Sequence, residues 1–103
     1  MSDEEDKRLS SLLHAFTAAT ERTERAVLGD QDLDRAFRRV DDVSEHVRKL
    51  YEQLTALRSQ IAAQIYEKEK LSLSVLAERW GMSKTRAGQI IRAAKQGEQG
   101  GNQ

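Results

Sequence analysis

The sequence predicts an all-α protein in which a long helical arm precedes a helix-turn-helix. The chain contains no proline in 103 residues, and its apolar residues recur at helical spacing over most of its length. Proline interrupts helices, so its absence favours long unbroken ones. Hydrophobic residues make up 38% of the chain and aromatic residues 5%, which is a lean core for so short a monomer. Burial of apolar surface between two copies is therefore expected.

The first predicted helix covers residues 3–28. Ser2 followed three residues later by Glu5 is a capping-box pattern, and acidic residues fill the first turn, where they suit the helix dipole. Gly29 is a stop signal, and Asp30 or Asp32 is suited to cap the next helix. The apolar positions at helical spacing are Leu9, Leu12, Leu13, Phe16, Ala19, Ala26 and Val27.

The second predicted helix, over residues 31–69, carries the strongest periodic signal. Its apolar residues follow an a/d heptad pattern for more than four heptads, over roughly 55–60 Å of helix. Three further apolar residues, Phe37, Tyr51 and Ile65, widen the stripe, which favours a bundle over a bare two-stranded coil. We name the following residues the dimerisation seam: Leu33, Val40, Val47, Leu50, Leu54, Leu57 and Ile61.

The short turn at Gly29 predicts that the first helix folds back antiparallel on the first half of the second. Two such hairpins could pair into a four-helix homodimer. The alternative is an intramolecular hairpin, with the rest of the seam covered by the C-terminal helices. The sequence does not distinguish a parallel from an antiparallel dimer.

Residues 71–95 contain two short helical patterns separated by a glycine. Ser72 is a good N-cap, and Leu71 with Leu76 forms a hydrophobic staple. Gly81 supplies the left-handed residue that a tight turn between helices needs, and Ser83 caps the second helix. The small Ala77, the glycine four residues later and the apolar Ile90 nine after that glycine have the spacing of a DNA-binding helix-turn-helix over residues 73–92.

The segment most resembles the region of bacterial sigma factors that reads the −35 promoter element. The resemblance covers about a fifth to a quarter of the chain. The chain is far shorter than a sigma factor, so the resemblance implies DNA binding and not recruitment of RNA polymerase. Gly88 lies inside the second predicted helix, although glycine is a poor helix former. It either allows the helix to approach the DNA backbone closely or has no role. The matching residues are Leu73, Leu76, Ala77, Glu78, Arg79, Gly81, Met82, Ser83, Gln89 and Ile90.

By analogy with such motifs, the exposed face of the second helix is expected to enter the major groove. Lysine reaches guanine acceptors, glutamine pairs with adenine, and a threonine methyl contacts thymine. The expected base-contacting residues are Ser83, Lys84, Thr85, Gln89 and Arg92. The expected phosphate-contacting residues are Ser72, Ser74, Arg86 and Lys95.

The charge distribution agrees with this placement. The net charge is zero, but residues 67–95 carry seven basic and three acidic side chains, a local charge of +4. The chain has no cysteine, two isolated histidines and no phosphate-binding glycine loop, so no enzyme activity, metal or cofactor is expected. The acidic N-terminus and the lack of a long apolar run predict a cytoplasmic, nucleoid-associated protein with no membrane partner.

The expected organisation is a helical arm over 1–70, a helix-turn-helix over 71–95 and a disordered Gly- and Gln-rich tail over 96–103. The favoured function is a sequence-specific dimeric regulator that binds double-stranded DNA. An architectural, partition or transfer protein is one alternative. A helical adaptor that binds a protein through its acidic arm is another. The sequence indicates neither the DNA target, nor an effector, nor whether transcription is raised or lowered.

Overall fold

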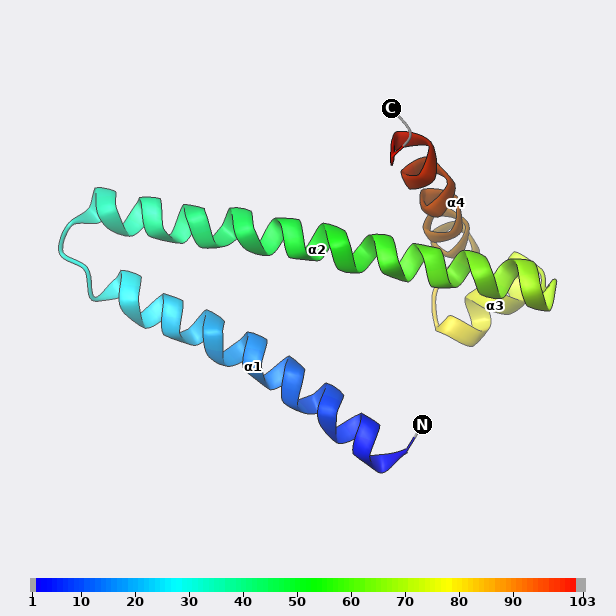
Figure 1. Ribbon diagram of the computed structural model, residues 1–103, viewed down its shortest axis with the longest axis horizontal. Coiled ribbons are helices and arrows are strands. Elements are labelled where there is room, and N and C mark those ends of the chain that lie inside the picture. The colour runs from blue at the N-terminus through cyan, green and yellow to red at the C-terminus, as the bar shows by residue number, and fades with distance from the viewer. Residues whose placement is uncertain (1, 102–103) are drawn as a thin grey trace. The chain divides into compact units, whose positions relative to one another are not determined.

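The computed structural model describes residues 2–101, and the side chains of residues 2–96. The described part of the chain is helical apart from short connections, so the predicted all-α fold class is confirmed (Figure 1). The chain divides within the second helix into an N-terminal unit, Met1–Val47, and a C-terminal unit, Arg48–Gln103. The helices are α1, Asp3–Leu28; α2, Leu33–Glu69; α3, Leu73–Trp80; and α4, Lys84–Gly101.

The N-terminal unit begins at the predicted cap. The Glu5 amide donates to the Ser2 hydroxyl oxygen at 3.2 Å. α1 then continues to Leu28 without a buried residue, and Leu9, Leu12 and Phe16 are all more than half exposed. The predicted packing of α1 on α2 therefore does not bury this apolar face within a single chain.

Asp30 organises the turn between α1 and α2. Its carboxylate accepts hydrogen bonds from the Asp32 amide at 2.9 Å and from Arg35 at 2.7 and 2.8 Å, with Arg39 at 3.4 Å. Asp32 is the residue that caps α2, because its side chain accepts from the Arg35 amide at 3.1 Å. The Arg35 hydrogen bonds, followed by that from the Asp32 amide, hold the pKa of Asp30 well below its usual value.

We expect the Asp30 carboxyl to titrate well below the usual midpoint of about 3.9. A depressed pKa in the folded state means that Asp30 stabilises the turn above about pH 4, and that this contribution is lost as the pH falls towards the folded-state pKa. Carboxyl-carbon NMR titration measures the midpoint directly. In the Arg35→Gln variant it should rise, and an ordinary midpoint in the parent would show that the contacts with Arg35 and Arg39 do not form in solution.

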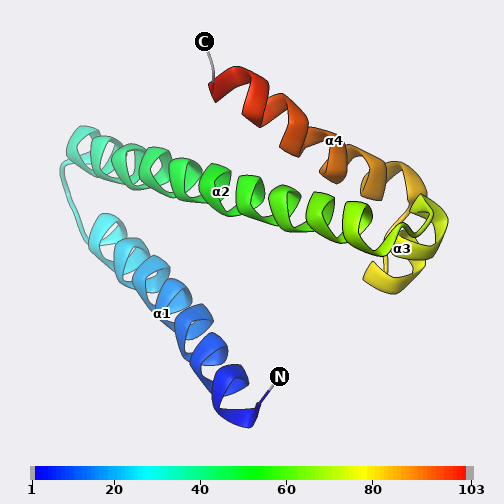
Figure 2. The same cartoon turned by 45° about the vertical axis from the view of Figure 1, so that its right-hand side comes forward.

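The C-terminal unit contains the hydrophobic core. Leu76 from α3 has no exposed surface, and Ile90 and Ile91 from α4 are 4% and 6% exposed. Ala62 of α2 joins this cluster, so the end of α2 packs with α3 and α4 (Figure 2). Partly buried residues that complete the cluster are Ala63, Ile65, Leu71, Leu73, Trp80 and Met82.

The disordered tail predicted for residues 96–103 stays a prediction. α4 is assigned as far as Gly101, and residues 102–103 lie outside the described part. Extending an existing helix fixes one residue for each hydrogen bond gained, and no proline stops it. None of the helices in the described part of the chain combines the length and the apolar composition that a membrane span requires.

Candidate nucleic-acid interface

The start of α3 is fixed by its cap. The Val75 amide donates to the Ser72 hydroxyl oxygen at 3.2 Å, and the Leu76 amide donates to the Ser72 carbonyl at 3.1 Å. Ser74 lies exposed in the first turn. The cap leaves the hydroxyl hydrogen of Ser72 available as a donor, so both serines are able to bind a phosphate oxygen at this end of α3.

Gly81 makes the turn into α4, as predicted. Its φ of 68° is left-handed, which glycine adopts without steric cost. The Gly81 amide donates to the Glu78 carbonyl at 3.2 Å and the Met82 amide to the Ala77 carbonyl at 2.9 Å, the pair of bonds that defines a Schellman motif. The half-buried Met82 then packs against the core, so the direction of the chain into α4 is set by local geometry.

The faces of α4 divide by burial. Ala87, Ile90 and Ile91 are buried against the rest of the unit. Thr85, Gln89 and Arg92 are exposed and spaced at i, i+4 and i+7, so they share the face that points away from the core. These side chains are exposed in the described part of the chain, with Gln89 at the edge nearest α2, and their types are able to hydrogen-bond with base edges.

The other predicted contact residues are also exposed, but they lie around this face. Ser83 precedes α4, and its hydroxyl oxygen accepts from the Arg86 amide at 3.0 Å. Helical spacing places Lys84 and Lys95 on one flank of α4 and Arg86 on the other. The structure thus brings the predicted residues together on and beside α4, with Ser72 and Ser74 at the start of α3.

Gly88 has a structural role that the sequence did not indicate. It is buried, and a Cβ atom at this position would lie 3.6 Å from the Leu73 side chain and 3.2 Å from Nη1 of Arg92. The Arg92 guanidinium therefore lies over Gly88. Direct approach of a DNA backbone to Gly88 would first require Arg92 to move.

Gly88→Ala should raise the free energy of unfolding by about 0.5–1 kcal/mol, because alanine is the better helix former and the closest atom is the flexible end of Arg92. Urea unfolding followed by Trp80 fluorescence measures this. Gly81→Ala is the matched contrast: its φ of 68° makes any side chain costly, so a loss of about 1–2 kcal/mol is expected. Destabilisation by Gly88→Ala would mean that Leu73 or Arg92 does not adjust.

An ion pair between α2 and α3 was not predicted. Arg79 donates to Glu69 at 2.9 Å, which raises the pKa of Arg79, and both side chains are over 40% exposed. Lys70, between them in sequence, ends α2 with a left-handed φ of 53°. The partners are ten residues apart and separated by a bend, so no periodic spacing marks them. An exposed pair of this kind contributes at most about 1 kcal/mol to stability.

The dimerisation seam is uncovered in the single chain. Leu33, Val47, Leu54 and Leu57 are each more than half exposed, at 78, 51, 57 and 52%. Val40 and Ile61 are 39 and 49% exposed, and Leu50 is half-buried. Soluble proteins rarely leave so continuous an apolar stripe in water unless it is an interaction surface.

No group of three or more acidic or histidine side chains that could hold a metal ion occurs among the described residues. The only buried side chain of polar type in this part of the chain, Ser59, has no orphaned polar atom. The candidate site is therefore a surface made of helix faces, and its chemistry is hydrogen bonding and charge. No known protein family, curated protein or solved structure matches the chain.

Proposed function

We propose that the protein is a sequence-specific, dimeric DNA-binding regulator that reads the major groove with α4. The observation that carries the proposal is the arrangement of α3, the left-handed Gly81 and α4, which leaves Thr85, Gln89 and Arg92 on an uncovered outward face. Such a face, following a tight turn from a supporting helix, is what a helix-turn-helix presents to base edges. A protein with this role works in the cytoplasm, on the nucleoid.

Dimerisation completes the proposal. One recognition helix makes few base contacts, and dimers gain affinity by placing two of them about one DNA turn, roughly 34 Å, apart. The exposed dimerisation seam supports pairing through α2, because a helix-helix interface would bury it. A protein that coats DNA without selecting a sequence would bind phosphates through the basic residues on the flanks of α4, Lys84, Arg86 and Lys95. It would not need base contacts from the outward face of α4.

Fluorescence anisotropy of a labelled duplex, recorded with the full chain over a series of NaCl concentrations, tests DNA binding. We expect the logarithm of the binding constant to fall linearly with the logarithm of salt concentration, since phosphate contacts release counterions. A double variant, Lys84→Ala and Arg92→Ala, should weaken duplex binding. Arg38 is an exposed arginine of the N-terminal unit, so Arg38→Ala should leave duplex binding unchanged. Absence of binding at about 10⁻⁴ M protein, the weak end of non-specific affinity, would leave the helical adaptor as the better account.

A further inference from the structure

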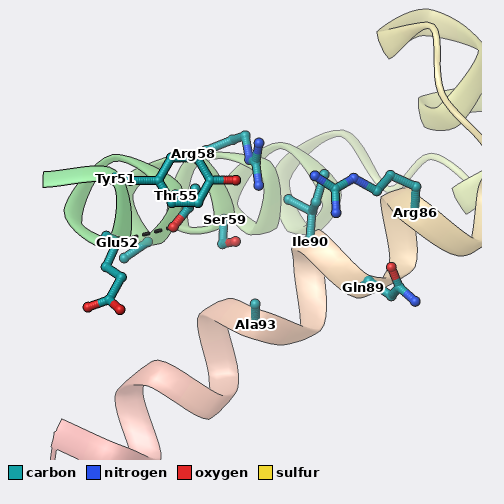
Figure 3. Close-up of a pocket in the computed structure, with 10 residues that line it drawn as sticks. Tyr51, Glu52, Thr55, Arg58, Ser59, Arg86, Gln89, Ile90 and Ala93 are labelled. Carbon is teal, nitrogen blue, oxygen red and sulfur yellow. Dashed lines mark hydrogen bonds between the residues drawn. The ribbon is translucent and has the colours of Figure 1, made fainter. Parts of the chain in front are cut away.

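A groove of about 440 Å³ lies between α2 and α4 within the C-terminal unit (Figure 3). α2 contributes Thr55, Arg58 and Ser59 to its wall, and α4 contributes Arg86, Ile90 and also Gln89, which lies at the edge between the groove and the outward face. Helical spacing places Arg86 on the flank of α4 that faces α2, beside the outward face rather than on it. The groove therefore borders the surface that we propose enters the major groove.

The charges in this groove are unbalanced. Neither Arg58 nor Arg86 has a carboxylate partner among the described residues. Glu52 is the one acidic residue in the wall, and its carboxylate pairs with Arg48 at 2.7 Å. Figure 3 shows the Arg86 side chain directed from α4 towards α2, with Ile90 between its guanidinium and that of Arg58.

Two guanidinium groups that line one groove without a carboxylate partner give the groove a positive charge, which attracts an anion. Guanidinium donors match the oxygens of a phosphate, and Arg86 stands in the first turn of α4, where the helix dipole also favours negative charge. Ser59 places a hydroxyl donor on the opposite wall, whereas the Thr55 hydroxyl already donates to the Glu52 carbonyl at 3.1 Å. The groove thus has the charge and the donor types of a phosphate site.

We propose that this groove binds a phosphate of the DNA backbone, with Arg58 of α2 and Arg86 of α4 as its two cationic ligands. The inference rests on the proposed function and adds to it, because Arg58 lies on the helix otherwise assigned only to dimerisation. α2 then contacts the duplex itself. A rigid helix that both pairs with its copy and binds the backbone fixes the register of each recognition helix on its half-site.

The salt dependence of duplex binding by the full chain tests this assignment. Arg58→Ala and Arg86→Ala should each weaken binding severalfold. Because the two arginines share one phosphate, the double variant should lower the slope of log K against log salt by about 0.9, the value for one phosphate, and not by twice that. Arg58→Lys should restore the slope but only part of the affinity, because lysine keeps the charge and loses the planar fork.

Arg38→Ala is the matched control, since Arg38 is an exposed arginine of the same helix outside the groove. Arg38→Ala should leave both the salt slope and the affinity of duplex binding unchanged. All variants should unfold at the same temperature as the parent protein. If the parent binds duplex with the expected slope and Arg58→Ala matches it, the inference is wrong while the proposed function stands. If the parent does not bind duplex, both fail.

A second experiment shows whether the groove binds a free phosphate compound or a phosphate of the DNA backbone. Inorganic phosphate is titrated into the protein and the Arg58 and Arg86 side-chain NMR signals are followed. Weak shifts that saturate only far above physiological phosphate are expected for a DNA site. Tight saturable binding of inorganic phosphate, abolished by Arg58→Ala without a change in duplex affinity, would assign the groove to a free phosphate compound and overturn the proposal.

Discussion

Replacing Val47 and Leu54 together with aspartate is expected to convert a dimer into a monomer and to weaken binding to a two-fold symmetric DNA site by at least about 100-fold. The two side chains are 51 and 57% exposed in the single chain and lie seven residues apart on one face of α2. Burying one such side chain contributes about 1.5–3 kcal/mol. The variant removes that contribution from both copies and would place four unpaired carboxylates in the interface.

Sedimentation equilibrium gives the oligomeric state, and anisotropy gives the affinity. The control is a double variant, Arg38→Asp and Lys49→Asp. Both positions are exposed and lie outside the dimerisation seam, and this variant changes the net charge by more than the test variant does. It should remain dimeric. A test variant that stays dimeric, or a monomer that binds the symmetric site as tightly as the parent, would show that α2 does not set the dimer.

Leu76→Ala is expected to destabilise the C-terminal unit by about 2–5 kcal/mol, the range for truncating a fully buried leucine. Leu76 has no exposed surface and lies at the centre of the cluster with Ala62, Ile90 and Ile91. Whole small domains are stable by about 5–15 kcal/mol, so this loss would populate the unfolded state near physiological temperature. DNA binding should fall with the folded fraction.

Trp80, the chain's single tryptophan, is half-buried beside this cluster and reports its unfolding in urea. The neighbouring Val75 is 46% exposed, so Val75→Ala should cost much less and serves as the control. Equal effects of the two substitutions would mean that Leu76 is not the centre of the core.

The helices and their caps were predictable because they depend on short-range rules. The Ser2, Ser72 and Ser83 caps each join a side chain to an amide three residues away, and Gly81 adopts the left-handed turn that its position required. The exposed positions on α4 follow from helical periodicity once its start is fixed. For the same reason, the predicted base-contacting residues fall on or beside one face.

Features that depend on contacts between helices were not predictable. The Glu69–Arg79 pair crosses a bend at Lys70, and the contacts around Gly88 involve Leu73 on another helix. The groove that holds Arg58 beside α4 exists only because α2 and α4 pack around Ala62.

Sequence-specific reading of double-stranded DNA by a dimer is tested by selecting bound duplexes from a random pool with the full chain, at about physiological salt, and sequencing them. We expect an enriched two-fold symmetric motif whose half-sites lie about one helical turn, roughly 10 base pairs, apart. Retention of duplexes without any enriched motif would contradict sequence-specific reading by α4, and no retention at all would contradict DNA binding itself.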